Sequence, residues 1–166
     1  MNLLVPRNVV VFAGLLAAPL STAIERPVVK VPAKTSDNRL KQLEIFFTEH
    51  DCPLRKHAQD FITAADQNDL DWRLLPSISF IESSGGKDYR NNNPFGWASC
   101  EQKFPSIRAG IHAVANRLAN SPLYRDKDID GILATYNPSP RYGRQVKAVM
   151  KTLAAIRAAA PDRLPN

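Results

Sequence analysis

The sequence predicts a mainly α-helical domain over about residues 36–160. Apolar residues recur three and four positions apart in six segments, as on the buried face of a helix, and capping or helix-breaking residues separate these segments. Residues 87–105 lack this period, so we expect an irregular or β-containing loop region there, with short extended pieces. The chain has no internal repeat, heptad pattern or low-complexity tract that would indicate another architecture.

Two helices are expected before the turn at residues 68–71. Ser36 or Asp37 can cap the first helix, and Cys52-Pro53 ends it, because proline cannot continue a helix. The second helix is expected over about 54–67. The positions that recur on the apolar faces are Leu40, Leu43, Phe46 and Phe47 in the first helix, and Ala58, Phe61, Ile62 and Ala65 in the second.

The third helix carries a carboxylate in an unfavourable place. Asp71 can cap this helix and Gly85-Gly86 ends it, with Glu82 in the last turn beside Phe80 and Ile81. The negative end of the helix dipole and the apolar neighbours both disfavour a charged carboxylate there, so the pKa of Glu82 should be raised. A glutamic acid that stays protonated near neutral pH is what a general acid needs. The alternative is a surface residue at a frayed helix end.

Three further helices are expected after the irregular stretch. Pro105-Ser106 opens the fourth, Ile129–Tyr136 forms a short fifth, and the sixth begins near Tyr142. Asn137-Pro-Ser-Pro140 separates the last two. The apolar positions are Ile107, Ile111, Val114 and Leu118, then Ile129, Ile132, Leu133 and Tyr136, then Val146, Val149, Met150, Leu153 and Ile156.

The first 35 residues are expected to lie outside the domain. A short basic flank, an apolar run over 9–20 and small residues up to Ala23 are typical of a secretory signal peptide at residues 1–23. An uncleaved membrane anchor is the alternative. Residues 24–35 are interpreted as a flexible linker and residues 161–166 as a tail. We therefore expect an exported protein of the periplasm, the cell envelope or the medium.

The chain is basic, with 22 Lys and Arg against 16 Asp and Glu, or a net charge of +6. An exported cationic protein suits an anionic partner such as a cell envelope. Charge alone would suit nucleic acid equally, but export and the scattered basic residues argue against it. Arg141, Arg144 and Lys147 form a local basic face that we interpret as solvated surface. We expect a monomer with no nucleic-acid partner.

The two cysteines and three histidines allow few further sites. Cys52 and Cys100 in an exported chain suit a disulfide, with two separate thiols as the alternative. The spacings of His50, His57 and His112 from the cysteines match no strong zinc pattern. We therefore expect no metal and no cofactor.

Four short pieces, over about Leu54 to Met150, carry a family resemblance. They are Leu74-Leu-Pro-Ser-Ile-Ser-Phe-Ile-Glu-Ser-Ser-Gly85, Asn92-Asn-Pro-Phe-Gly-Trp97, Phe104-Pro-Ser-Ile107 and Thr135-Tyr-Asn-Pro138. In this order the chain resembles the lysozyme-like superfamily, and most of all bacterial lytic transglycosylases and endo-β-N-acetylglucosaminidase-type domains of cell-wall hydrolases. The resemblance implies a lysozyme-like helical enzyme that cleaves β-1,4 bonds between N-acetylglucosamine and N-acetylmuramic acid in the glycan strands of peptidoglycan.

The resemblance also assigns roles to single residues. Glu82 would be the catalytic acid, and Tyr136 with Asn137 would be the family's Tyr-Asn pair, which orients an N-acetyl group or stabilises charge at the anomeric carbon. Aromatic rings suit stacking on sugars, and Ser83 or Ser84 could hold Glu82 by a hydrogen bond. The candidate substrate-binding residues are Ser83, Phe95, Trp97, Tyr136 and Asn137. Ordinary core, capping or turn roles are the alternative for each of them.

The number of catalytic carboxylates is left open. Most glycosidases use two, and Asp88 and Glu101 are the local candidates for the second. Lytic transglycosylases use one, because the substrate's N-acetyl oxygen assists and the 6-hydroxyl of muramic acid attacks. Asn93–Trp97 stands where those enzymes have Gly-Leu-Met-Gln and looks more like the glucosaminidase branch, so the product stays open. The alternative function is a non-catalytic glycan-binding or scaffold module of an envelope-spanning machine.

Overall fold

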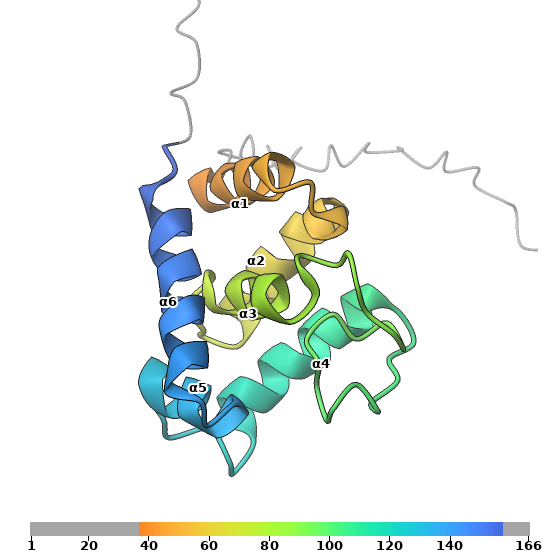
Figure 1. Ribbon diagram of the computed structural model, residues 1–166, viewed down its shortest axis with the longest axis vertical. Helices are drawn as coiled ribbons and strands as arrows, with labels where there is room; N and C mark the ends of the chain where they lie inside the picture. The colour runs from red at the N-terminus through yellow and green to blue at the C-terminus, as the bar shows by residue number, and fades with distance from the viewer. Residues whose placement is uncertain (1–36, 158–166) are drawn as a thin grey trace, which may run out of the picture. The chain divides into compact units, whose positions relative to one another are not determined.

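The computed structural model describes residues 37–157, so the expected signal peptide, linker and tail lie outside the described residues. Within this range the chain forms only helices and loops, which confirms the prediction of a mainly α-helical domain. In chain order these are α1 (Asn38–Glu49), the short 3-10 helix η1 (Pro53–His57), α2 (Ala58–Gln67), α3 (Leu74–Ser83), α4 (Ile107–Asn120), α5 (Ile129–Tyr136) and α6 (Pro140–Ala155) (Figure 1). None of these helices is long and apolar enough to cross a membrane.

Helix α3 lies in the middle of the helical assembly and packs against α6 and α2 (Figure 1). Every side chain from Leu74 to Ser79 is buried, serines included. A helix that is apolar on all sides is stable only inside a core, where neighbouring helices cover each face. Pro76 does not interrupt it, because the first turn needs no backbone donor from that position. The helix therefore leads from the core to Glu82 at its far end.

A row of phenylalanines joins α1, α2 and the loop after α3. The rings of Phe46 and Phe47 lie 5.9 Å apart, Phe47 and Phe61 5.8 Å, and Phe61 and Phe95 6.2 Å between centroids. Aromatic pairs at these separations contribute about 0.5–1.5 kcal/mol each beyond their buried area. The loop is thus anchored to the core through Phe95.

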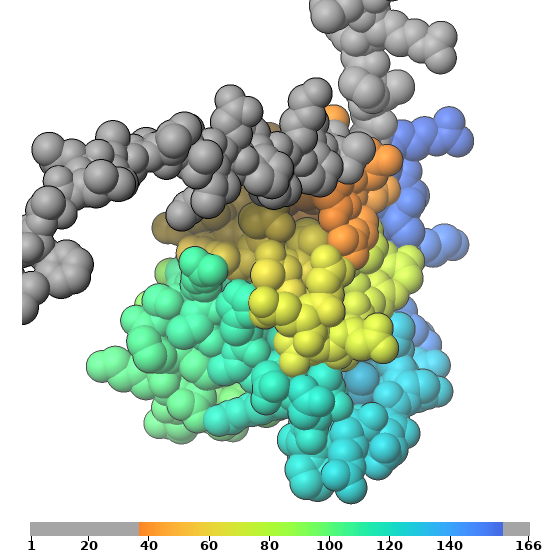
Figure 2. Space-filling view, turned by 180° about the vertical axis from the view of Figure 1, so that it is seen from behind, coloured from red at the N-terminus to blue at the C-terminus, as the bar shows by residue number. Residues whose placement is uncertain are grey.

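Seen from behind, α2 and the turn after it lie between α1 and the segment from α4 to α5 (Figure 2).

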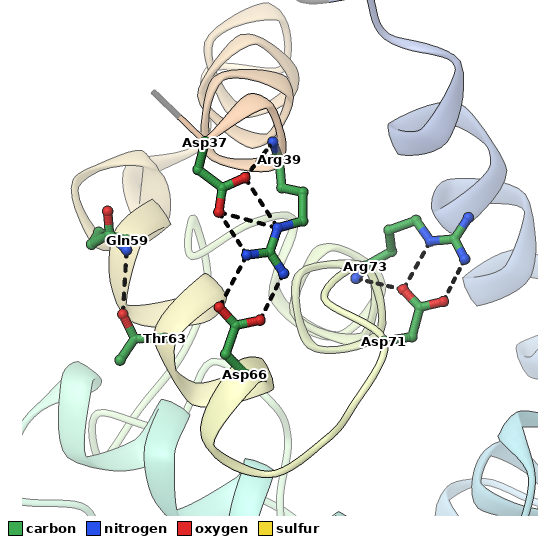
Figure 3. A network of polar contacts seen from close by, with 7 residues as sticks. All are labelled: Asp37, Arg39, Gln59, Thr63, Asp66, Asp71 and Arg73. Atoms are coloured by element: carbon green, nitrogen blue, oxygen red, sulfur yellow. Dashed lines mark hydrogen bonds and ion pairs between the residues drawn. The ribbon is translucent and has the colours of Figure 1, made fainter. Parts of the chain in front are cut away.

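Polar contacts fix the start of α1 on α2 (Figure 3). The Asp37 carboxylate accepts a hydrogen bond from the backbone N–H of Arg39 at 2.9 Å, which confirms the expected cap. The Arg39 guanidinium lies between Asp37 and Asp66, 2.6 Å from an oxygen of each. Because these groups are about a third to a half exposed, each pair contributes at most about 1 kcal/mol. Their effect is mainly to orient the two helices.

Three helix boundaries differ from those expected. The expected second helix is divided into η1 and α2 at His57. Helix α3 begins at Leu74, later than expected, because Asp71 forms the preceding turn and accepts from the N–H of Arg73 at 2.9 Å (Figure 3). Helix α6 begins at Pro140 rather than near Tyr142, since proline at the first helical position loses no helical hydrogen bond.

Candidate active site

The end of α3 is fixed by a turn of three left-handed residues. Ser84, Gly85 and Gly86 have φ angles of 51°, 68° and 89°. A Cβ atom on Gly85 would lie 2.3 Å from the sulfur of Cys52, and one on Gly86 would lie 2.7 Å from Cγ of Leu54. The N–H of Leu54 donates to the carbonyl of Gly85 at 3.1 Å. The glycines therefore end the helix, as predicted, and let the chain pass directly over the segment before α2.

The two cysteines are free thiols, so the disulfide that the sequence allows is not formed. Cys52 is buried beneath the turn at Gly85, with its sulfur 3.7 Å from the carbonyl oxygen of His50 and 3.8 Å from that of Ser84. Cys100 belongs to the loop after α3 and is partly exposed. The alternative of two separate thiols is the arrangement in the structure.

Three consecutive asparagines, Asn91–Asn93, close the loop between α3 and α4. Their side-chain N–H groups donate in order to the carbonyls of Cys100 at 3.0 Å, Phe104 at 2.9 Å and Trp97 at 2.8 Å. Asn93 is buried, and its side-chain oxygen also accepts from the backbone N–H of Trp97 at 3.1 Å. These bonds replace the regular backbone pairing that the irregular stretch lacks. The loop therefore has a defined shape without strands.

The same loop contains a short left-handed run of non-glycine residues. Ala98, Ser99 and Cys100 have φ angles of 52°, 52° and 64°. Such a conformation costs about 1–2 kcal/mol for each residue with a Cβ atom. It persists because the asparagine contacts and the bond from the N–H of Cys100 to the carbonyl of Gly96, at 3.2 Å, hold the turn. Strain of this kind clusters at functional sites.

The loop, the end of α3 and the end of α5 surround a pocket of about 430 Å³. Its lining residues are Glu82, Gly96, Trp97, Ala98, Ser99, Tyr124, Tyr136 and Asn137. Four of these were expected from the sequence: Glu82, Trp97, Tyr136 and Asn137. The fold thus brings the expected acid, one aromatic platform and the Tyr-Asn pair to one cavity.

Glu82 is the only carboxylate on this pocket in the described part of the chain. The residue is open to solvent on the pocket side, but burial of its carboxyl end raises the pKa. The hydroxyl of Tyr142 partly opposes this rise. Helix α3 has no basic residue in its last turn, so the negative end of the helix dipole acts in the same direction as burial. The direction is the one predicted for a general acid.

Gly96 brings the loop backbone onto the Glu82 carboxylate. A Cβ atom at Gly96 would lie 2.6 Å from Oε2 of Glu82, and the φ angle of Gly96 is 63°. Both the close approach and the left-handed backbone require a residue without a side chain. The loop therefore removes water from one side of the carboxylate while the other side stays open to the pocket.

Aromatic side chains form one wall of the pocket. The ring of Trp97 lies 5.5 Å from that of Tyr136 and 6.0 Å from that of Tyr124, and the guanidinium of Arg117 lies 5.6 Å from the Trp97 ring. The Tyr136 hydroxyl donates to the carbonyl of Phe95 at 2.5 Å, and burial holds the Tyr136 pKa well above its usual range. Tyr136 therefore stays neutral and rigid.

Asn137 presents an amide beside this wall. It follows the last residue of α5, and its backbone N–H donates to the carbonyl of Leu133 at 3.0 Å. Its side-chain oxygen accepts from the N–H of Ser139 at 3.0 Å, which orients the amide. The side-chain N–H groups have no acceptor among the described residues, so they remain for a ligand.

Two of the expected substrate-binding residues do not line the pocket. Phe95 is fully buried against Phe61, so its ring cannot stack on a sugar, and only its carbonyl supports Tyr136. Ser83 is also buried, and its hydroxyl lies 2.8 Å from the carbonyl oxygen of Pro94 and does not bond Glu82. Both predictions of substrate contact are wrong, because irregular segments and helix ends carry no period that separates inside from outside.

The candidates for a second carboxylate also lie outside the pocket. Asp88 and Glu101 are both exposed. Glu101 is 78% exposed and pairs with Arg90 at 3.0 Å. Within residues 37–157, no three His, Cys, Asp or Glu side chains are grouped so that they could hold a metal ion.

Sequence reasoning missed two tyrosines and the backbone of Gly96–Ser99. Tyr142 lies near Glu82 and belongs to the first turn of α6, where its helical position gave no sign of a contact with α3. Tyr124 lies in the turn after α4, where no periodic pattern marks its direction. Only the three-dimensional packing of α3, α5 and α6 reveals these contacts.

Comparison with known proteins identifies no relative. No protein-family model matches the chain, and no curated protein and no solved structure is significantly similar to it. The interpretation of the pocket therefore rests on its own residues and geometry.

Proposed function

We propose that this protein is an exported glycosidase of lysozyme-like fold that cleaves β-1,4 bonds in the glycan strands of peptidoglycan, with Glu82 as general acid. The observation that carries the proposal is the position of Glu82, a carboxylate with a raised pKa on a pocket walled by Trp97 and Tyr136. Indole and phenol rings suit the flat faces of sugars, and the amide of Asn137 suits an N-acetyl group.

The presence of one carboxylate on the pocket favours a route that needs one. Glu82 gives its proton to the glycosidic oxygen, the bond from that oxygen to the anomeric carbon breaks, and the carbonyl oxygen of the substrate's N-acetyl group bonds to that carbon. The 6-hydroxyl of the same muramic acid then displaces the N-acetyl oxygen and returns its proton to Glu82. The exposed positions of Asp88 and Glu101 support this route over one with a second protein carboxylate.

The test of the acid is Glu82→Gln, which keeps the side-chain size and removes the proton donor. We expect the release of soluble fragments from purified peptidoglycan to fall by about a hundredfold or more, in line with the usual contribution of a general acid. The matched control is Glu101→Gln on the exposed part of the same loop, which should keep full activity. If Glu82→Gln is as active as the wild type, the assignment of Glu82 is wrong.

Binding separates the enzyme from a non-catalytic module. The Glu82→Gln variant should still co-sediment with insoluble peptidoglycan, because the aromatic wall and Asn137 are intact. If the wild-type protein binds peptidoglycan as tightly as the variant does but releases no soluble fragments, the result would contradict the glycosidase and favour a glycan-binding module. Mass spectrometry of the released fragments decides the bond: anhydromuramic ends indicate transglycosylation, reducing N-acetylglucosamine ends indicate a glucosaminidase, and reducing muramic ends indicate a muramidase.

A further inference from the structure

Tyr142 is a buried tyrosine next to the pocket that the expected mechanism does not use. It lies in the first turn of α6, is 6% exposed, and stacks on Tyr136 with 5.9 Å between ring centroids and 4° between ring planes. No described residue forms a hydrogen bond with its hydroxyl. Buried polar groups without a partner are rare, and each calls for an explanation.

The ionisable group that faces this hydroxyl from α3 is Glu82. The two side chains lie close enough for each to shift the other's pKa, although they fall short of hydrogen-bond geometry in the free protein. Burial, and then the negative charge of Glu82, raise the pKa of Tyr142, so the phenol keeps its proton at any physiological pH. Tyr136 from α5 and Tyr124 from the turn after α4 also face this cluster, and both are neutral donors.

A hydrogen bond from the Tyr142 hydroxyl to Glu82 matters most when Glu82 loses its proton. A protonated carboxyl group gains little from a further donor, whereas a carboxylate forms a stronger, charge-assisted bond with a phenol. Catalytic hydrogen bonds are often long in a free enzyme and shorten when negative charge develops. Glu82 is attached to the open end of α3 through a flexible side chain, so a small rotation can close the contact.

We propose that Tyr142 is a positioning residue for Glu82: its hydroxyl donates to the carboxylate formed when Glu82 gives up its proton, and holds that carboxylate facing the pocket. This inference rests on the proposed role of Glu82 as the acid. The ring of Tyr142, stacked on Tyr136, also keeps the pocket tyrosine in place. Removal of the hydroxyl alone therefore separates the two effects.

The direct test is a titration of Glu82 by carbon-13 NMR of its carboxyl carbon in the wild type and in Tyr142→Phe. Loss of the donor destabilises the ionised form, so the pKa of Glu82 should rise in the variant. The control is Tyr89→Phe, which removes a hydroxyl from an exposed loop tyrosine and should leave the titration unchanged. An unchanged or lower pKa of Glu82 in folded Tyr142→Phe would overturn the proposal.

A second measurement uses no Tyr142 variant. The ring carbon that bears the Tyr142 hydroxyl should change its chemical shift as Glu82 titrates, and this change should vanish in Glu82→Gln. A Tyr142 signal that ignores the ionisation of Glu82 would also overturn the proposal. Tyr142→Phe itself should fold, because the hydroxyl it removes has no partner to lose.

Kinetics then connect the contact to the reaction. For Tyr142→Phe we expect kcat on peptidoglycan to fall about ten- to a hundredfold, the range for loss of a hydrogen bond to a charged group, with KM little changed. The high-pH limb of the rate profile should move upward with the pKa of Glu82. Adding Tyr142→Phe to Glu82→Gln should cost no further activity. The titrations need no substrate, so a protein that shows the NMR shifts but cuts no peptidoglycan contradicts the glycosidase and not the contact.

Discussion

At the scale of single residues, the carboxylate of Glu82 lies against the backbone of Gly96 and near the hydroxyl of Tyr142, at the end of a helix whose last turn carries no basic residue. The folded protein therefore binds the Glu82 proton more tightly than the unfolded chain does. By linkage, ionisation of such a group lowers stability, because the proton is lost more easily from the unfolded state. If Glu82 is the proposed general acid, the site sacrifices stability for reactivity.

This linkage predicts a pH-dependent gain in stability for Glu82→Gln. Between the ordinary pKa of glutamic acid and the raised value in the fold, the folded state holds more protons, so wild-type stability falls as pH rises through this window. The Glu82→Gln variant has no carboxyl group at this position, so its stability does not fall in this way. In urea unfolding at pH 7 it should be more stable than the wild type, by less than about 1 kcal/mol because pocket water screens the carboxylate.

The difference should disappear below about pH 4, where Glu82 is protonated in both states. Glu101→Gln is the matched control, since Glu101 is 78% exposed and gains nothing from neutralisation. A Glu82→Gln variant that is less stable than the wild type at pH 7 would contradict the raised pKa.

At the scale of elements, helices with their own start signals were predicted well. Helix α4 begins after Ser106, whose hydroxyl accepts from the N–H of Ala109 at 3.1 Å, and α5 covers the expected residues Ile129–Tyr136. The division between η1 and α2 was missed, because apolar spacing is nearly the same in a 3-10 turn and an α-helix over so few residues.

The loop between α3 and α4 shows what the sequence could not predict. Phe95 and Trp97 are two positions apart and were expected to act alike, yet Phe95 is fully buried and Trp97 lines the pocket. Their directions depend on the bonds of Asn91–Asn93 to distant carbonyls. The sequence marks these asparagines as turn formers, but not which carbonyls they reach. Glu82 was singled out by its place at the end of an apolar helix, and Tyr136 by a family resemblance, whereas Tyr124 and Tyr142 required the packing.

The loop predicts unequal effects for two asparagine variants. Asn93 is buried and bonds Trp97 twice and the carbonyl of Gln102 at 3.2 Å, so Asn93→Ala leaves several backbone groups unpaired and should cost about 1–3 kcal/mol. Asn91 is exposed and makes one side-chain bond, so Asn91→Ala should cost less than about 1 kcal/mol. Urea unfolding measures both.

Hydrogen exchange locates the effect of Asn93→Ala. Amide exchange of residues 94–102 should become faster, while that of α1 and α6 stays unchanged, and activity should fall because Trp97 loses its fixed place. Equal losses of stability in the two variants would contradict a special role of Asn93 in the loop.

At the scale of the whole molecule, helical packing joins three distant segments in one site. Helix α3 is held by α6 and α2, and the pocket forms where its last turn meets the loop after it and the end of α5. The chain also carries a net charge of +6. If the substrate is peptidoglycan, the carboxylates of its peptide stems are anionic, and a cationic surface raises the local concentration of enzyme on the polymer.

This attraction predicts that salt weakens binding to peptidoglycan. Charges on the protein and the polymer act over a screening length that shortens from about 30 Å at 0.01 M salt to about 8 Å at 0.15 M. The Kd of the inactive Glu82→Gln variant for insoluble peptidoglycan should therefore rise several-fold over this range. Peptidoglycan whose carboxyl groups have been converted to amides provides the control, because it keeps the glycan and loses the charge. Binding to the amidated polymer should be weaker at low salt and nearly independent of salt. An equal salt dependence for both polymers would mean that salt acts on the protein itself and not on its attraction to an anionic wall.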